Sequence, residues 1–129
     1  MLAKIFHTSW TDEEGRFYST RFLGGNETTF NKDDFFNICC QQRSVENAAI
    51  KSANKLVVFD TDAVITQYYC NMYLGSQDPR IESFVSSDRY DLVLFMTPDV
   101  PWVPDGFRWN DDDKTRAVLN SNLMKMYED

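Results

Sequence analysis

The sequence predicts an α/β fold in which helices cover a parallel sheet. Two short runs, Lys55–Phe59 and Leu92–Met96, are almost uniformly apolar, which is typical of strands buried on both faces of such a sheet. About thirty residues separate the two runs, enough for the helical crossover that parallel strands need. With 129 residues, 43% of them hydrophobic, we expect residues 1–129 to form one domain around one core.

The amino-terminal elements are short. Leu2–Phe6 has the apolar pattern of a helix with no capping residue before it, and Thr8–Trp10 fits a short strand. Thr11–Arg16 then reads as a turn dense in charge. Apolar residues recur at helical intervals from Tyr18, and we expect that helix to end at Gly24.

A long helix is predicted from a cap at Asn31 to about Ala53. Asp34 stands three residues after Asn31, as in a capping arrangement. The apolar residues that should form its buried face are Phe35, Ile38, Cys39, Val45 and Ala49.

Helices and one stiff loop are predicted after the first apolar run. Val64–Tyr73 is amphipathic, and after a break at Gly75–Pro79 a second helix should end near Ser87. Three prolines within seven positions make Thr97–Arg108 a stiff loop. Thr115–Tyr127 carries apolar residues at helical spacing and should form a last helix.

The charge and the cysteine content indicate which partners and which cellular compartment to expect. The net charge of −7 argues against a nucleic-acid or anionic-membrane partner. With no signal peptide and no long apolar run, we expect a soluble, cytoplasmic protein. Cys39, Cys40 and Cys70 are interpreted as buried core thiols in a reducing compartment, in preference to a nucleophile paired with His7.

The acidic segment Asp60-Thr61-Asp62 follows the first apolar run directly. Ligands bind at the carboxyl ends of strands in open parallel sheets. One carboxylate there can hold Mg²⁺ directly or through water, and a second can orient or deprotonate a hydroxyl. The alternative is that Asp62 caps the following helix and Asp60 is a solvated loop residue, and both interpretations stay open.

An acidic strand end of this kind holds the magnesium ion in P-loop enzymes, whose phosphate loop GxxxxGK[ST] comes from an earlier strand. Residues 1–129 contain no such loop, so we expect it before Met1 and expect little kinase activity from the chain as given.

The proline-rich loop supplies further candidates. Trp102 is either a platform for a planar ring or a hydrophobic plug, and Asp105 begins a turn. Arg108 and Arg116 flank the acidic run Asp111–Asp113. They are interpreted either as lid residues that close over a phosphoryl group or as a solvated salt-bridge face.

Together these motifs resemble the ribosylnicotinamide kinase domain of the bifunctional NAD-biosynthesis regulator family, a P-loop NTPase. The resemblance spans nearly the whole chain. It rests on Glu13-x-Gly15-Arg16-x-Tyr18, Gln42 and Glu46, Phe59-Asp60-Thr61-Asp62, Tyr73-x-Gly75, Tyr90–Leu94, and Pro98-Asp99-Val100-Pro101-Trp102-Val103-x-Asp105-Gly106-x-Arg108.

The resemblance implies ATP-dependent, Mg²⁺-dependent phosphorylation of the ribose 5′-hydroxyl of nicotinamide riboside. It assigns Asp60 to the Mg²⁺ side, and Asp62 and Glu13 to ribose contact or base catalysis. Trp102, Asp105 and the Glu13–Arg16 turn belong to the riboside pocket, and Arg108 and Arg116 to the lid.

The chain departs from the family pattern at both ends, where a first strand with its loop and a last strand are expected outside residues 1–129. The adenylyltransferase and DNA-binding domains of some relatives do not match this sequence. The alternatives are a kinase for another nucleoside and a non-catalytic remnant or binding module. The oligomeric state is left open.

Overall fold

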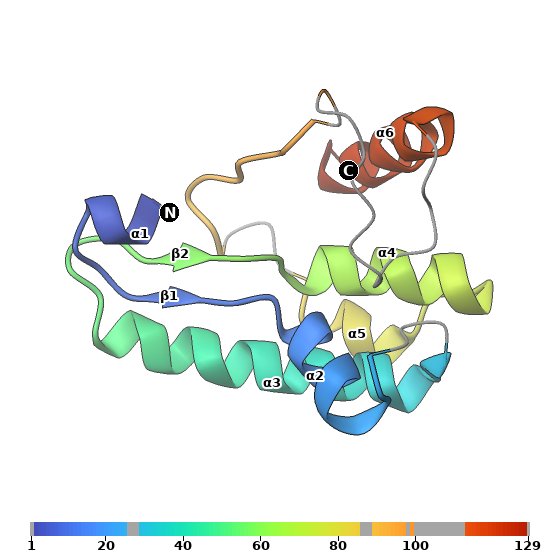
Figure 1. Cartoon of the computed structure of the whole chain (residues 1–129), viewed down its shortest axis with the longest axis horizontal. Coiled ribbons are helices and arrows are strands. Elements are labelled where there is room, and N and C mark those ends of the chain that lie inside the picture. The colour runs from blue at the N-terminus through green and yellow to red at the C-terminus, as the bar shows by residue number, and fades with distance from the viewer. Residues whose placement is uncertain (1, 26–28, 86–88, 98, 100–112, 129) are drawn as a thin grey trace. The chain divides into compact units, whose positions relative to one another are not determined.

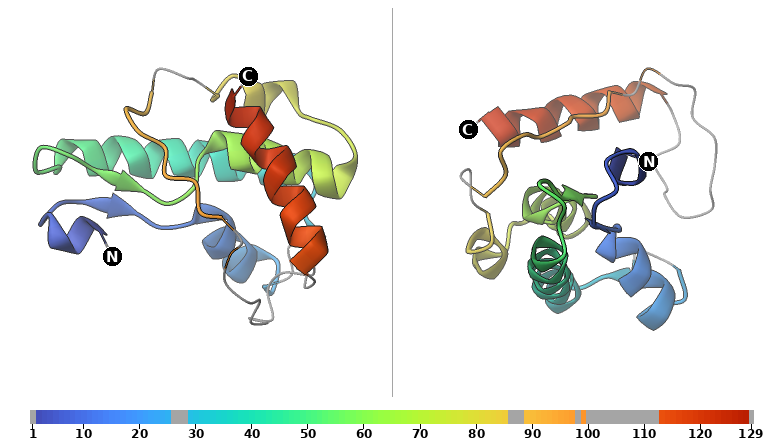
Figure 2. Two further views of the ribbon diagram at one scale, coloured as in Figure 1. Left: turned by 90° about the horizontal axis from the view of Figure 1, so that it is seen from above. Right: turned by 90° about the vertical axis from the view of Figure 1, so that its left-hand side faces the viewer.

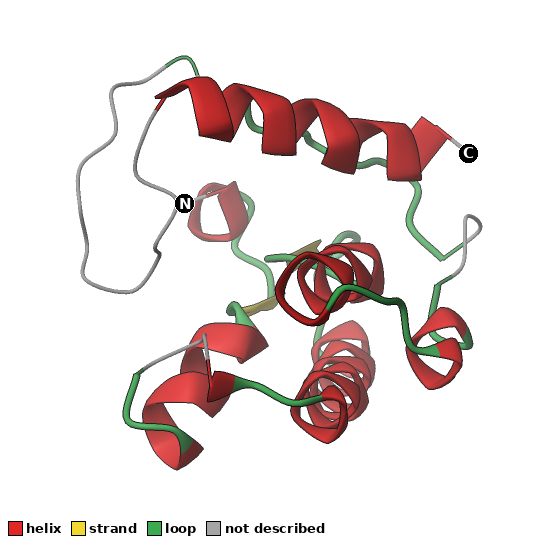
Figure 3. Ribbon diagram, turned by 90° about the vertical axis from the view of Figure 1, so that its right-hand side faces the viewer, coloured by secondary structure: helices red, strands yellow, loops and turns green. Residues whose placement is uncertain are grey.

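The computed structural model describes residues 2–25, 29–85, 89–97, 99 and 113–128. Helices predominate there, with one small parallel sheet among the described residues (Figure 3). The predicted α/β class is therefore confirmed. The elements in chain order are α1 (Leu2–Ile5), β1 (Trp10–Thr11), α2 (Glu14–Phe22), α3 (Lys32–Lys51), β2 (Val58–Phe59), α4 (Ala63–Leu74), α5 (Pro79–Glu82) and α6 (Asp113–Glu128). They fall into two compact units, Met1–Val85 and Ser86–Asp129.

Strands β1 and β2 lie side by side in parallel, with Trp10 opposite Val58 and Thr11 opposite Phe59. Both end on the side of the unit where α2 and α4 begin (Figure 1). The strands are shorter than predicted, because β1 is shifted from Thr8–Trp10 and β2 keeps only the end of Lys55–Phe59. Lys55 has φ of 67°, a left-handed conformation that turns the chain and delays the strand.

Helix α3 begins with the capping box that the sequence predicts. The Asn31 side chain accepts a hydrogen bond from the Asp34 amide at 2.9 Å, and the Asp34 carboxylate accepts one from the Asn31 amide at 2.8 Å. These two bonds satisfy amide groups that have no partner inside the helix. The helix runs alongside both strands (Figures 1 and 2) and ends at Lys51, close to the predicted end.

The buried face of α3 differs from the prediction at its centre. Val45, expected in the core, is only half-buried, and Gln42 and Glu46 are buried instead. The helical period explains the difference, since these two residues continue the buried stripe that runs from Phe35 to Ala49.

Helix α2 begins earlier than expected. Gly15 and Arg16, predicted to lie in a charged turn, are in its first turn. The cause is local, because Glu14 is an acidic residue at the positive end of a helix dipole. Tyr18 on this helix is buried.

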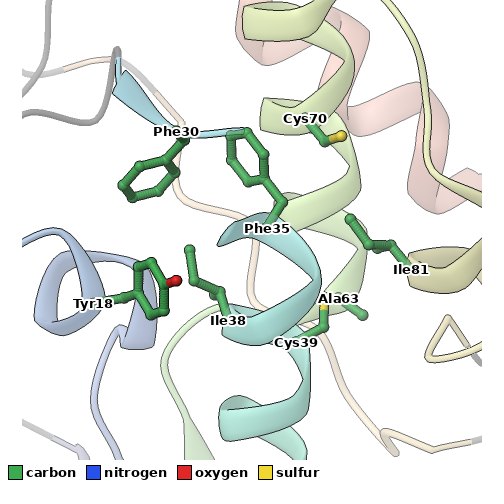
Figure 4. Close-up of a cluster of buried hydrophobic side chains, with 8 residues drawn as sticks. All are labelled: Tyr18, Phe30, Phe35, Ile38, Cys39, Ala63, Cys70 and Ile81. Carbon is green, nitrogen blue, oxygen red and sulfur yellow. The ribbon is translucent and has the colours of Figure 1, made fainter. Parts of the chain in front are cut away.

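The main core lies where α3, α4, α5 and α2 meet. In Figure 4, three α3 side chains stand between the aromatic residues on one side and the α4 and α5 residues on the other. The cluster consists of Tyr18, Phe30, Phe35, Ile38, Cys39, Ala63, Cys70 and Ile81. Phe30 packs edge-on against both Tyr18 and Phe35, with ring centroids 5.9 and 5.1 Å apart.

Helix α4 has a defined start and end. The Asp62 side chain caps its first turn, and Gly75 ends it with φ of 76°, which a glycine adopts at little cost. Gln67 then fixes the next segment, because its carboxamide exchanges two hydrogen bonds of 3.1 Å with the backbone of Asp78. Helix α5 is shorter than the helix expected to end near Ser87, and residues 86–88 lie outside the described ones.

The second unit confirms one prediction and overturns another. Helix α6 matches the predicted last helix, and Tyr127 packs edge-on against Phe95 at 6.0 Å between ring centroids. The predicted strand Leu92–Met96 is irregular, so that prediction is wrong. An apolar run becomes a strand only when a neighbouring strand pairs with it, and the described residues of this second unit contain no strand.

Candidate functional site

The parallel register brings two acidic segments to one edge of the sheet. Beyond Thr11 the chain continues into Glu13, and beyond Phe59 it continues into Asp60. The Asp60 amide donates a hydrogen bond of 3.2 Å to the Thr11 carbonyl, which extends the ladder one residue past β2. The ends of both strands are therefore tied together where the candidate residues begin.

Asp60 and Asp62 have different environments. Asp60 is exposed, whereas Asp62 is buried and its side chain accepts a hydrogen bond of 3.1 Å from the Ile65 amide. Thr61 between them has φ of 66°, which is costly for a β-branched residue and turns the chain sharply. Of the alternatives left open by the sequence, helix capping by Asp62 is thus confirmed, and Asp60 is the carboxylate that solvent and a ligand can reach.

Glu13 and Arg16 lie close together at the start of α2. Glu13 is the residue before the helix, and Arg16 Nε lies 3.6 Å from Glu13 Oε2. Both side chains are partly exposed, so this ion pair contributes little to stability and leaves the carboxylate at the surface.

Glu14 is a candidate that the sequence did not single out. Partial burial, and secondly the charge of Asp12, raise the pKa of its carboxyl above the ordinary range. A carboxyl with a raised pKa beside a strand end has the property of a general acid or base. Sequence spacing gave no signal for it, because its burial depends on how α2 packs.

A polar layer lies between β1 and α3. Gln42 Nε2 lies 3.5 Å from Thr11 Oγ1 and 3.2 Å from Glu46 Oε1, and all three residues are buried. Arg43 Nε lies 3.7 Å from the other oxygen of Glu46. The sequence signal for this layer is two polar residues four positions apart on an otherwise apolar helical face.

The buried thiol of Cys39 is not suited to act as a nucleophile. Burial raises the pKa of the Cys39 thiol to about 12, and a hydrogen bond with Thr66 offsets this only in part. Such a thiol stays protonated and unreactive near neutral pH. Cys39 and Cys70 are buried as predicted, but Cys40 is exposed, because it lies on the outer side of α3.

The remaining predicted residues belong to the second unit. Arg116 is half-buried on α6. Trp102, Asp105 and Arg108 lie outside the described residues, so their roles stay predictions.

The donor set at this edge suits magnesium better than a transition metal. No group of three or more histidine, cysteine or acidic side chains gathers within the described ranges. Mg²⁺ takes one or two carboxylates and completes its shell with water and substrate phosphates. The exposed carboxylate of Asp60 fits that requirement.

Comparison with known proteins decides the family. A family described as an AAA domain matches residues 1–129, the whole chain. The chain belongs to the AAA domain family. The predicted P-loop NTPase-like class is thereby confirmed, and members of this AAA family generally use a nucleotide and Mg²⁺.

Two curated relatives extend the assignment. The trifunctional NAD biosynthesis/regulator protein NadR of Escherichia coli (strain K12) is 34% identical over 128 residues, which cover 99% of this chain and 31% of the relative. The protein of the same name from Salmonella typhimurium (strain LT2) gives the same identity and coverage. The AAA domain chain thus spans about a third of the length of these relatives, and its resemblance to a NAD-biosynthesis regulator is confirmed.

No helix in the described part of the chain combines the length and the apolar character needed to cross a membrane.

Proposed function

We propose that this chain forms the acidic strand edge of an ATP-dependent kinase that phosphorylates the 5′-hydroxyl of nicotinamide riboside. The observation that carries the proposal is the parallel pairing of β1 and β2, which sets Glu13 and Asp60 at adjoining strand ends. The identity with two NAD-biosynthesis regulators over nearly the whole chain supports the choice of substrate.

In this proposal the two carboxylates differ in role. Asp60, which is exposed, is the residue that would hold Mg²⁺, and the bound ion would supply positive charge to offset that of the ATP phosphates. Glu13 contacts the ribose or takes the hydroxyl proton, and its pairing with Arg16 keeps the carboxylate oriented. The Asp62 side chain is engaged as the cap of α4, so Glu13 is the better placed of the two candidates for the ribose.

Residues from the carboxyl-terminal part of the chain complete the proposal. Trp102 covers the nicotinamide ring and Asp105 belongs to the same pocket. Arg108 and Arg116 close over the transferred phosphoryl group, where guanidinium groups stabilise developing charge.

Nuclear magnetic resonance titration of the 129-residue chain tests the proposal. Nicotinamide riboside should shift the amide signals of Glu13, Gly15 and Asp60, and Mn²⁺ used in place of Mg²⁺ should broaden Asp60 most strongly. Nicotinamide without its ribose is the matched control and should leave Glu13 unshifted. Equal shifts with adenosine would point to another nucleoside, and no shift with any nucleoside would favour a non-catalytic module.

A further inference from the structure

The polar layer under the site is buried at a cost. Gln42 and Glu46 are 4% and 1% exposed, and the Oε1 atom of Gln42 has no hydrogen-bond partner among the described residues. An unpaired buried acceptor is destabilising, and an apolar side chain of similar size would fill the space without it. Packing alone therefore does not account for a carboxamide at this position.

The carboxamide nitrogen of Gln42 links α3 to β1. It bridges Glu46 Oε1 at 3.2 Å and Thr11 Oγ1 at 3.5 Å, and so joins the middle of α3 to the last residue of β1. The carbonyl of Thr11 in turn accepts the Asp60 amide at 3.2 Å. Glu46 is itself held by Arg43, at 3.7 Å, so the bridge starts from a fixed point.

Thr11 is the point on which both candidate carboxylates depend. Glu13 follows it by two residues along the chain, and Asp60 is bonded to it across the ladder. Asp60 is also held by β2 and by the Asp62 cap of α4, so a movement of Thr11 away from α3 would stretch the bond to the Asp60 amide and shift Glu13 relative to Asp60. Phosphoryl transfer depends on such separations, because misplacement by about 1 Å can lower rates by about 100-fold.

We propose that Gln42 is a positioning residue that ties Thr11 to Glu46 and so holds the strand ends carrying Glu13 and Asp60 at a fixed spacing. The positioning of the strand ends, which is the structural half of the proposal, follows from the hydrogen bonds alone. The expected effect on riboside and Mg²⁺ binding, which is the functional half, rests on the proposed function.

Amide hydrogen exchange on the whole chain tests the structural half. Gln42→Met keeps the length of the side chain and removes both donors, and Thr11→Val removes the acceptor while keeping the shape. In each variant the Asp60 amide should exchange about fivefold faster or more, the effect of losing one ordinary hydrogen bond. The Val58 amide, bonded to the Ser9 carbonyl at 3.4 Å, is the internal reference and should keep its rate.

Two control variants match these changes. Gln41→Met makes the same substitution on the exposed side of α3. Ser9→Ala removes a second hydrogen bond to α3, the 2.6 Å bond from Ser9 Oγ, just before β1, to the Ala49 carbonyl. Both should leave the exchange rate of the Asp60 amide unchanged.

Two outcomes would overturn the inference. One is an equal rise in the exchange rate of every amide in Gln42→Met and Thr11→Val, which would mean general destabilisation. The other is an unchanged exchange rate at Asp60. If Gln42→Met does not fold, Thr11→Val alone decides.

Titration of the same variants with nicotinamide riboside tests the functional half. Gln42→Met should weaken riboside binding by about fivefold or more, and Gln41→Met should not. Unchanged binding in Gln42→Met would overturn the inference while leaving the proposed function intact. If the wild-type chain binds no riboside but Asp60 exchange responds as expected, the proposed function fails and the positioning of the strand ends stands.

Discussion

Tyr18 on α2 donates a hydrogen bond of 2.7 Å to Asp34 on α3. The other oxygen of the Asp34 carboxylate accepts the Asn31 amide in the capping box. One carboxylate therefore fixes both the start of α3 and the position of α2, which begins directly after Glu13. The placement of one side of the site thus depends on a contact some distance from it.

Removing this contact should cost stability. Tyr18→Phe deletes the phenol and should lower the free energy of unfolding by about 1–2 kcal/mol, because the acceptor is charged. Urea denaturation measures the change. In a double-mutant cycle with Asp34→Asn, the coupling energy between the two residues should account for most of the stability lost in Tyr18→Phe. Additive effects of the two substitutions would show that the bond contributes nothing.

The stability of the fold should fall at alkaline pH. Burial holds the pKa of Cys39 at about 12 in the folded chain, above its ordinary value of 9.0. The unfolded chain releases this proton first, so the stabilisation is complete below pH 9 and is lost as the pH rises toward 12. Ionisation of Cys39 should lower the free energy of unfolding by up to about 1.4 kcal/mol for each pH unit in this range.

Two alanine variants isolate that slope in urea denaturation between pH 9 and pH 10. Cys39→Ala should flatten it, whereas Cys40→Ala, at the exposed neighbouring position, should not. A slope that stays the same in Cys39→Ala would assign the alkaline loss to other groups, such as Tyr68, whose pKa burial raises to about 12.

Substitutions at Asp62 separate the helix cap from the charge. Asp62→Ala should lower the free energy of unfolding by about 1 kcal/mol, because the Ile65 amide loses its acceptor. Asp62→Asn should stay within about 0.5 kcal/mol of the wild type, since asparagine caps as well as aspartate. Thermal unfolding compares the three proteins. An equal loss in both variants would mean that the negative charge, not the cap, stabilises α4.

Because the backbone at Thr61 is strained, replacing this residue with glycine should stabilise the fold. Thr61→Gly should raise the free energy of unfolding by up to about 1 kcal/mol, because glycine accepts φ of 66° without strain. Thr20→Gly, on the exposed side of α2, is the control and should cost about 0.3–0.5 kcal/mol. Denaturation by urea compares the two. Destabilisation by both substitutions would show that Thr61 stores no strain.

Local signals in the sequence predicted the helices well. The capping box at Asn31 and Asp34, and the glycine that ends α4, act within one turn and need no tertiary information. The strands were harder, because β1 and β2 exist only where each faces the other. Leu92–Met96 has the composition of a strand, but its own unit holds no pairing partner among the described residues.

The candidate site was predictable only where it depends on local sequence, as the fold was. Its acidic residues follow from strand ends, but the polar layer at Gln42 depends on which face of α3 meets β1. The sequence left open whether Asp62 caps a helix, and the hydrogen bond to the Ile65 amide answers that question. Trp102, Asp105 and Arg108 remain predictions from a sequence motif.

Turnover by an extended protein tests whether the acidic strand edge serves a nicotinamide riboside kinase. A version carrying an upstream strand and a GxxxxGK[ST] loop before Met1 is supplied with Mg·ATP and nicotinamide riboside, and nicotinamide mononucleotide is quantified by chromatography. We expect steady turnover that falls at least about 100-fold in Asp60→Asn, as when a group that supports transition-state charge is lost. The exposed variant Asp33→Asn, on α3, is the control and should turn over normally. An extended protein that binds Mg·ATP yet forms no nicotinamide mononucleotide, or one in which Asp60→Asn is fully active, would contradict the account.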